Sequence, residues 1–402
     1  MSQQSHTQEH DRVRLSTAQA RLREVISSHG RVETIPPGDA DGRVLAADLA
    51  AQRAVPHYRR AAMDGFAIRA ADVADASETS PVTLALAEEG GPGRAVPVHT
   101  GSPLPEDADT VVRLERARER GGRIEVSREI PRGKDVAPVG EDVRAGEALF
   151  AASHRLRPSD LGLLRATGVT EVPVSEPPEV AVLPTGDEVV ERDPAPGETV
   201  ETNGVTVSQY VTRWGGNARR RDVVPDEVGA LSAAIETDLD ADLVVTTGGS
   251  SVGARDLVPE AVESVGELCL HGIAHKPGHP AGFGVVRGTP VILLPGYPVS
   301  AIVNAVQLLR PAMARLVDRT PDSPPTVEAR LTRAISSEPG TRRYERVRLD
   351  GSDPPEATPV AASGAGVLSS VALADGWVVV PENETGIESG ETVVVEDWEP
   401  AL

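Results

Sequence analysis

The sequence predicts a multidomain α/β plus β protein, in which a central doubly wound α/β domain follows a β-rich domain and precedes a small all-β domain. Three observations lead to this fold class. The chain has 402 residues, more than one hydrophobic core usually serves. Strand and helix patterns alternate from Glu179 onward, which is typical of a parallel sheet covered on both faces. The flanking regions instead carry short alternating apolar runs, which are typical of β-structure.

The N-terminal region is predicted to begin with a helix and to continue as β-structure. Ser16-Thr17-Ala18-Gln19 is a capping-box pattern, and Gly30 is the expected stop signal. Residues 55–136 then carry short alternating runs separated by Gly and Pro, which predict the β-rich module. Helical sequence returns near Pro158.

The α/β domain is predicted from alternating elements that end near Arg319. Its expected strands are residues 180–183, 223–224 and 243–246, and its expected helices are residues 205–214 and 226–239. A proline-rich linker follows at residues 321–325. The last segment alternates again up to residues 377–380 and 392–395, which predicts the small all-β domain.

Two glycine-containing turns each follow an apolar strand and open a helix. They are Thr247-Gly248-Gly249-Ser250-Ser251-Val252-Gly253 and Leu294-Pro295-Gly296. Both would stand at the carboxyl edge of the parallel sheet, where open α/β folds bind ligands, and such loops present backbone N–H groups to phosphate or another oxyanion. Ala254-Arg255 excludes the nucleoside triphosphate loop, and the absence of Gly-x-Gly-x-x-Gly excludes the dinucleotide loop. A tight turn without ligand remains the alternative.

Lys276 lies in His275-Lys276-Pro277-Gly278-His279 and is a candidate for binding an anion. Only Lys134 and Lys276 are lysines among the 40 basic residues, so the composition disfavours lysine wherever a generic positive charge would serve. The compact ammonium group of Lys276 is therefore predicted to have a specific role. Chance retention of one lysine is the alternative.

Carboxylates accompany these turns. Asp187 and Glu188 follow the first strand of the α/β domain, Asp256 follows the glycine loop, and Asp226 opens a helix. Carboxylates beside a phosphate site suit Mg²⁺, which keeps several waters and bridges to ligand oxygens. Helix capping is the alternative for Asp226 and Asp256.

Composition limits the partners and the compartment. The formal charge of −21 opposes binding to nucleic acid, and the acidic, Lys-poor composition suits either a halophile-like, salt-rich cytoplasm or a GC-rich genome. No apolar run approaches the ~20 residues of a membrane helix, and residues 1–14 lack the apolar core of a signal peptide. We therefore expect a cytoplasmic protein without membrane or nucleic-acid partners.

The ordered set of short motifs resembles the molybdopterin molybdotransferases, the MoeA family that also includes the C-terminal domain of gephyrin. The set is Met63-Asp64-Gly65-Phe66-Ala67, Thr100-Gly101, Gly140-Glu141-Asp142, Thr185-Gly186-Asp187-Glu188, Thr202-Asn203, the glycine loop with Asp256, Lys276-Pro277-Gly278 and Leu294-Pro295-Gly296-Tyr297-Pro298-Val299-Ser300-Ala301. Each motif is weak by itself, but the set in this order is specific.

The resemblance implies four domains in each protomer of a homodimer. They would be a discontinuous N-terminal domain (residues 10–50 and 138–178), the β-rich domain (51–137), the molybdopterin-binding α/β domain (179–320) and a C-terminal β-barrel domain (324–402). The site would combine the α/β and C-terminal domains of one chain with the β-rich domain of the other.

The resemblance also implies the reaction: molybdate insertion into adenylated molybdopterin with Mg²⁺ and release of AMP. The metal ligands would be Asp187, Glu188 and Asp256, with Asp226, Lys276 and His279 also catalytic. The substrate-binding residues would be Asp64, Thr100, Asp142, Asn203, Gly248, Gly249, Ser250, Ser251, Gly253, Pro295, Gly296 and Ser369. His279 stands where family members often have a second lysine, and Ser370 is the alternative to Ser369.

Two other functions remain open at this point: a molybdopterin adenylyltransferase and a non-catalytic molybdopterin-binding scaffold. Adenylyltransferases of this kind resemble the α/β domain alone, whereas more than half of this chain lies outside it. A scaffold would keep the fold without the acidic and lysine residues of the site. An upstream adenylyltransferase and recipient molybdoenzymes are further expected partners, and the sequence leaves open whether molybdate or tungstate is inserted.

Overall fold

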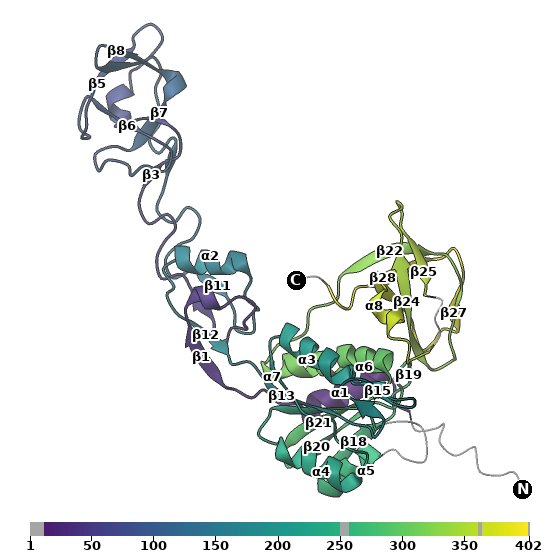
Figure 1. The fold of residues 1–402 in the computed structure, drawn as a ribbon. Coiled ribbons are helices and arrows are strands. Elements are labelled where there is room, and N and C mark those ends of the chain that lie inside the picture. Colours follow the sequence, from purple (N-terminus) through teal and green to yellow (C-terminus); the bar gives the residue numbers. More distant parts are fainter. Residues whose placement is uncertain (1–11, 250–256, 361–363, 401–402) are drawn as a thin grey trace, which may run out of the picture. The chain divides into compact units, whose positions relative to one another are not determined.

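The computed structural model describes residues 12–249, 257–360 and 364–400. These residues form two compact units: unit 1 comprises Met1–Arg31 and Ser175–Leu402, and unit 2 comprises Val32–Val174. Unit 1 holds the α/β domain and the C-terminal barrel, and unit 2 holds the β-rich module (Figure 1). No helix among the described residues is long and apolar enough to cross a membrane.

The α/β domain of unit 1 is built on a six-stranded sheet with the order β16-β13-β17-β21-β20-β18. The first four strands are parallel, β20 pairs antiparallel with β21, and β18 pairs antiparallel with β20. Pro184 pairs with Thr247 and Thr247 pairs with Leu294, so three parallel strands end at one edge. The strands are β13 (Glu179–Pro184), β16 (Asn217–Arg220), β17 (Leu243–Thr247), β18 (Glu267–His271), β20 (Gly282–Val286) and β21 (Thr289–Leu294).

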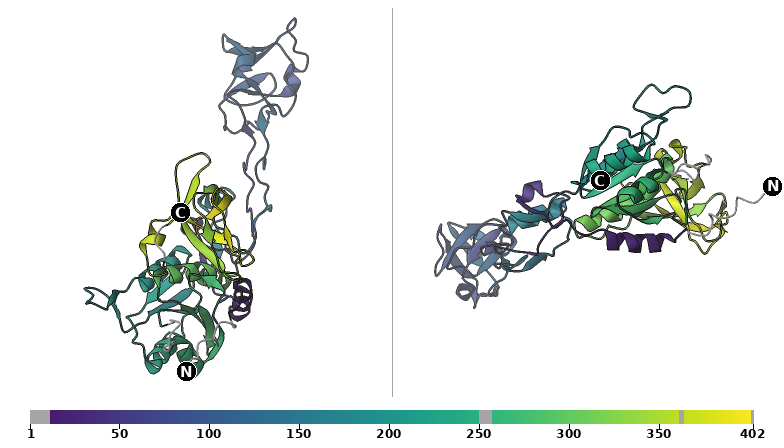
Figure 2. Two further views of the ribbon diagram at one scale, coloured as in Figure 1. Left: turned by 90° about the vertical axis from the view of Figure 1, so that its right-hand side faces the viewer. Right: turned by 90° about the horizontal axis from the view of Figure 1, so that it is seen from below.

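Helices cover both faces of this sheet, which confirms the doubly wound prediction (Figure 2). Alternate strand residues point to opposite faces, so Val180 and Val182 enter one core while Ala181 and Leu183 enter the other. The first core is covered by α1 (Leu15–Val25), α3 (Asn203–Arg213), α6 (Pro298–Asn304), the π-turn η4 (Ala305–Leu309) and α7 (Arg310–Leu316). The second core is covered by α4 (Val228–Thr237) and α5 (Leu257–Val265).

Two sequence-based predictions about elements of unit 1 are wrong. Helix α1 begins at Leu15 behind Arg14, which makes no side-chain cap, and it ends at Val25, before Gly30. The helix is held by burial of Leu15, Ala18 and Leu22 in the α/β core, and not by a cap at Ser16. The strand expected at residues 223–224 lies earlier, at β16 (Asn217–Arg220), whose polar residues show no apolar alternation. Val224 makes only an isolated bridge.

The C-terminal domain is a closed five-stranded barrel, as predicted. Its ring runs β24-β25-β22-β28-β26 and closes through pairing of β26 with β24. Ala329, Val347 and Val378 are among its buried core residues. The elements are β22 (Thr326–Leu331), β24 (Arg342–Leu349), β25 (Glu356–Pro359), β26 (Gly376–Val380) and β28 (Thr392–Glu396), with the short pair β23 (Ile335–Ser336) and β27 (Gly386–Ile387) and the helix α8 (Ser369–Ala372).

The barrel packs directly on the α/β domain within unit 1. Tyr344, Trp377 and Trp398 belong to the same buried cluster as residues of α3 and α6. Trp377 stacks on Trp398 at 4.6 Å between ring centroids and meets Tyr344 edge-on at 5.0 Å. The strand β19 (His275–Lys276) leaves the α/β domain and adds to barrel strand β24, with Lys276 opposite Arg343. The barrel and the α/β domain therefore share both a core and a sheet.

Unit 2 contains a six-stranded sheet with the order β7-β4-β6-β5-β9-β8, which confirms the β-rich prediction. Phe66, Leu84 and Ile124 are buried in its core. A separate core joins residues from both sides of this module in the sequence, including Leu45 and Leu164. The elements are β1 (Val32–Ile35), η1 (Pro37–Asp39), β2 (Leu49–Ala50), β3 (Arg60–Ala61), β4 (Gly65–Ile68), η2 (Ala70–Val73), β5 (Val82–Leu86), β6 (Arg94–Val98), β7 (Thr110–Arg113), η3 (Leu114–Arg116), β8 (Ala117–Arg120), β9 (Arg123–Val126), β10 (Val136–Ala137), β11 (Ala148–Phe150), α2 (Pro158–Ala166) and β12 (Val172–Ser175).

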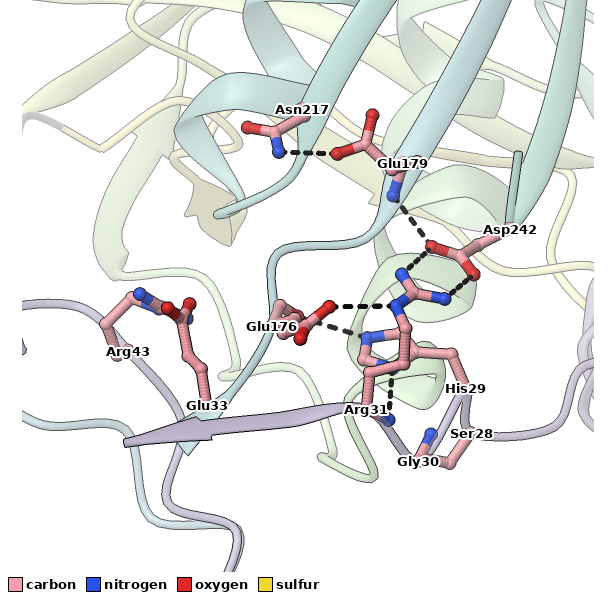
Figure 3. A network of polar contacts seen from close by, with 10 residues as sticks. All are labelled: Ser28, His29, Gly30, Arg31, Glu33, Arg43, Glu176, Glu179, Asn217 and Asp242. Atoms are coloured by element: carbon pink, nitrogen blue, oxygen red, sulfur yellow. Dashed lines mark hydrogen bonds and ion pairs between the residues drawn. The ribbon is translucent and has the colours of Figure 1, made fainter. Parts of the chain in front are cut away.

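A polar network in unit 1 ties together the segments at which the chain leaves this unit and returns to it (Figure 3). Arg31 donates to both oxygens of Asp242 at 2.6 Å and to Glu176 at 3.0 Å. Asp242 also accepts the backbone N–H of Glu179 at 2.8 Å. Burial opposes ionisation of Asp242, but these hydrogen bonds outweigh it and lower the pKa of the carboxyl group. Every charge drawn around Arg31 therefore has a partner.

Candidate functional site

A cavity of about 1090 Å³ lies in unit 1 between the carboxyl edge of the parallel sheet and the barrel. The turns after β13, β17 and β21 line one side, and barrel strand β24 lines the other. The predicted site residues that line it are Glu188, Asn203, Gly248, Gly249, Lys276, His279, Pro295 and Gly296. The structure thus brings together groups that are up to 108 positions apart in the sequence.

The glycine turns allow the loops at this edge to approach one another closely. Gly248 has a φ of +122°, and a Cβ there would lie 2.3 Å from the carbonyl oxygen of Thr185. Gly278, after Lys276, has a φ of +106°, and a Cβ there would lie 2.2 Å from Nδ2 of Asn304. Both positions therefore require glycine for conformation and for space. Asn203 adds a link between turns by donating to the carbonyl of Gly296 at 2.7 Å.

Lys276 is positioned by a buried amide of helix α6. Nδ2 of Asn304 donates to the carbonyl of Gly278 at 2.9 Å, which fixes the turn that follows Lys276. Nζ of Lys276 donates to Oε1 of Glu338 at 2.6 Å, and this contact lowers the pKa of Glu338. Both side chains are partly exposed, so the pair contributes little stability. An anion in the cavity can therefore replace Glu338 at small energetic cost.

Not all of the predicted acidic site residues lie at the cavity. Glu188 is exposed and lines the cavity, and Asp187 beside it is exposed and accepts the backbone N–H of Asp226 at 3.0 Å. Asp226 does not line the cavity, and Asp256 lies outside the described residues. Within the described ranges no three His, Cys, Asp or Glu side chains form a metal cluster. Glu188 at the cavity, with Asp187 next to it in the chain, suits Mg²⁺, which takes its remaining ligands from water and phosphate.

His279 lines the cavity and is half-buried. Burial, together with the positive charges of Arg12 and Lys276, lowers the pKa of its imidazole to about 4. The ring is therefore neutral near pH 7 in the ligand-free protein. Its Nε2 atom is buried and has no hydrogen-bond partner among the described residues.

The remaining predicted residues lie elsewhere. Asp64, Thr100 and Asp142 belong to unit 2, where Asp64 accepts from the backbone N–H and the hydroxyl of Thr100 at 2.6 and 3.0 Å. Ser369 is exposed on α8 and does not line the cavity; Ser370 is buried and donates to the carbonyl of Val367 at 2.6 Å. Ser250, Ser251 and Gly253 lie outside the described residues.

Sequence reasoning expected the C-terminal domain at the site but missed the residues of β24, and it also missed two hydroxyls on the sheet side. Residues 343–346 of β24 line the cavity, as do Thr185 and Thr247. Buried Oγ1 atoms of Thr185 and Thr247 and the buried Nε of Arg346 have no hydrogen-bond partner among the described residues. Strand β24 has four arginines among its eight residues, and this is the signal that could have indicated the barrel side of the site.

Three family models match successive segments of the chain. Residues 13–168 match the MoeA N-terminal region (domain I and II), residues 181–315 match a family described as "Probable molybdopterin binding domain", and residues 328–398 match the MoeA C-terminal region (domain IV).

Relatives match the chain over nearly its whole length. Molybdopterin molybdenumtransferase 2 of Mycobacterium tuberculosis is 32% identical, with 90% of this chain and 94% of the relative covered. Molybdopterin molybdenumtransferase of Bacillus subtilis is 30% identical, with 91% and 90% covered. The crystal structure of the molybdopterin biosynthesis MoeA protein from Pyrococcus horikoshii is 32% identical, superposes with a TM-score of 0.85, and is matched over 97% of this chain and 100% of that chain. The chain therefore belongs to the MoeA family of molybdopterin molybdenumtransferases.

Proposed function

We propose that the protein inserts molybdate into adenylated molybdopterin and releases AMP. The observation that carries the proposal is the cavity at the carboxyl edge of the sheet. It combines Lys276, glycine turns and buried polar atoms that have no hydrogen-bond partner in the described part of the chain. An acidic protein that binds an anionic substrate needs such a local set of donors. Family membership and the names of the relatives support the same reaction.

Each group of residues has a distinct part in this proposal. Lys276 supplies a compact positive charge for the anionic substrate, and the amides of Gly248 and Gly249 orient its oxygens. Asp187 and Glu188, with Asp256, hold Mg²⁺. When bound there, Mg²⁺ would polarise phosphoanhydride oxygens and improve AMP as a leaving group. Neutral His279 donates or accepts one hydrogen bond without adding charge.

The central experiment measures AMP release from adenylated molybdopterin with Mg²⁺ and either molybdate or tungstate. We expect oxyanion-dependent AMP release, and the two oxyanion arms determine which metal is inserted. AMP formation from ATP and free molybdopterin would instead identify an adenylyltransferase. The absence of turnover in every arm, with substrate binding retained, would identify a binding scaffold.

The proposal includes a homodimer in which Asp64 and Thr100 complete the site of the other chain. Its support is that these residues belong to unit 2, whereas the cavity is enclosed by unit 1. Mixing inactive Asp64→Ala protomers with inactive Glu188→Ala protomers should restore part of the activity, because one site in each mixed dimer is intact. Absence of rescue after demonstrated subunit exchange would refute action in trans.

The reaction needs a supplier and an acceptor. An adenylyltransferase must form the adenylated substrate, and recipient molybdoenzymes must take up the product. Both would share the cytoplasm with this protein. A pull-down with an adenylyltransferase carrying bound product tests the first contact, and transfer of activity to a molybdenum-free apoenzyme tests the second.

A further inference from the structure

The turn that carries Lys276 is held from behind by two polar side chains, His275 and Asn304. Both are fully buried and neither lines the cavity, whereas Lys276, Gly278 and Ser300 do. Nε2 of His275 lies 3.2 Å from the carbonyl oxygen of Gly278, and Nδ2 of Asn304 donates to the same oxygen at 2.9 Å. Because a carbonyl oxygen only accepts, the imidazole carries its proton on Nε2. Two donors thus converge on one backbone oxygen of the turn.

Asn304 also connects this turn to a second cavity-lining segment. Its Nδ2 atom donates to the carbonyl of Ser300 at 2.9 Å, and Ser300 belongs to α6, the helix that follows the Pro295-Gly296 turn. The helix changes to the π-turn η4 at Ala305, directly after Asn304, and such turns within helices are frequent at functional sites. One amide group therefore fixes the spacing between two segments of the cavity wall.

His275 is neutral and firmly packed. Burial lowers the pKa of its imidazole to about 4, so the ring carries a single N–H near pH 7. The ring lies edge-on to Tyr344 with 6.0 Å between ring centroids, and the backbone of His275 pairs with Arg342 of β24. The Nε2–H donor is therefore held toward Gly278 by the barrel.

The pair is not explained by stability alone. Nδ1 of His275 and Oδ1 of Asn304 are buried and have no hydrogen-bond partner in the described part of the chain. Unpaired buried polar atoms are destabilising, and the residues around them, such as Ile302, Ala305 and Tyr344, belong to the largely apolar core of unit 1. Two polar side chains at such positions favour a role in placing the turn.

We propose that His275 and Asn304 are positioning residues, which hold Lys276 in the orientation in which its ammonium group binds the anionic substrate. The inference rests on the proposed function for the identity of that substrate. Without the two donors the Gly278 peptide can adopt other conformations, since glycine has the widest choice of backbone angles. Substrate binding would then have to order the turn as well as the lysine side chain, and this lost entropy weakens affinity.

A double-mutant cycle in the full-length protein tests whether Asn304 acts through Lys276. Calorimetry would measure the Kd of AMP and of molybdate, as separate probes, for wild type, Asn304→Leu, Lys276→Met and the double variant. Lys276→Met should weaken at least one probe by roughly 10- to 100-fold, and Asn304→Leu should weaken the same probe by about tenfold. The double variant should match Lys276→Met within about twofold, because the position of the turn no longer matters once the ammonium group is absent.

His275 allows a rescue experiment. His275→Phe keeps a ring against Tyr344 but loses the Nε2–H donor, so it should weaken the same probe as Asn304→Leu. His275→Gln supplies an amide N–H in place of Nε2–H and should bind that probe more tightly than His275→Phe. Ser232→Ala is the matched control, because Ser232 is buried on α4, donates to the carbonyl of Ala261 at 3.2 Å and lies outside the cavity lining. This control should lower the Tm and keep both affinities.

The outcomes distinguish this inference from the proposed function. Affinities within about twofold of wild type in Asn304→Leu and His275→Phe would overturn the inference, as would losses that add in the double variant. A wild-type protein that binds neither probe, or affinities that do not change in Lys276→Met, would overturn it as well, and AMP release could still stand. Coupling between Asn304 and Lys276 in a protein that releases no AMP would support the inference and reject the molybdate-insertion reaction.

Discussion

The two ends of the parallel sheet in unit 1 differ in how far their polar groups are paired. At the amino end, Arg31 is held by Asp242 and Glu176, and the network in Figure 3 is fully partnered. At the carboxyl end, buried polar atoms such as Oγ1 of Thr247 have no hydrogen-bond partner among the described residues. Polar groups at the amino end of the sheet therefore stabilise the fold, whereas polar groups at the carboxyl end can form hydrogen bonds with a ligand.

The largest expected effect of a substitution is on catalysis at the carboxyl end. Glu188→Gln should lower AMP release by ~10²-fold or more, because it removes a carboxylate from the proposed Mg²⁺ site. Its free energy of unfolding should change by only ~0.5 kcal/mol, since the side chain is exposed. Glu260→Gln, an exposed carboxylate of α5 outside the cavity lining, is the control. Full activity in Glu188→Gln would contradict the proposed role.

The amino end should show the reverse pattern. Arg31→Ala leaves the mostly buried carboxylate of Asp242 without its bidentate partner, and we expect a loss of about 2 kcal/mol in the free energy of unfolding. Partial exposure of Arg31 keeps the loss below that of a fully buried pair. Urea denaturation measures it, with exposed Arg213→Ala as the control. AMP release per folded molecule should stay at the wild-type rate, and a catalytic defect would break the contrast between the two ends.

His279 should make a smaller difference at the carboxyl end. Since burial holds its pKa at about 4, wild-type affinity for molybdate should not change between about pH 6 and pH 8. His279→Lys adds a charge beside Lys276 and should tighten binding by up to about tenfold. His279→Gln, which stays neutral, should resemble wild type. A wild-type affinity that rises steadily as the pH falls through this range would show that the ligand protonates the ring.

The smallest expected effect concerns the pH dependence of the amino-end network. The pKa of Asp242 is lowered, so its stabilising contribution is complete above the ordinary aspartate value of about 3.9 and disappears as the pH falls through the lowered pKa. Asp242→Asn should therefore be about 1 kcal/mol less stable than wild type at neutral pH, with a gap that narrows in acid. Chemical denaturation at a series of pH values measures the gap. A difference in the free energy of unfolding that does not change with pH would mean that the charge of Asp242 does not contribute to stability.

The sheet side of the site could be predicted from the sequence because short local patterns specify it. A glycine turn after an apolar strand specifies both the backbone conformation and the edge of the sheet, so the sequence alone predicts that Gly248 and Gly296 lie at this edge. Lys276 was identified from its rarity in the composition, and it also lines the cavity.

The barrel side could not be predicted in the same way. Arg346 reaches the cavity only because the barrel packs on helices of the α/β domain, a contact between segments far apart in the chain. Strand β16 was missed for a related reason: its polar residues show no apolar alternation, and pairing with β13 rather than local pattern defines it. Metal binding by Asp256 and the dimer stay predictions.

The turn that contains Lys276 is hydrogen-bonded on two sides. Its backbone is bonded to barrel strand β24, while Asn304 of α6 holds the next turn from the α/β side. A swing of the barrel away from the sheet would therefore pull Lys276 along or break the two-residue pairing with Arg342 and Arg343. The backbone of Lys276 is thus attached both to the barrel and, through the Gly278 turn, to the α/β domain.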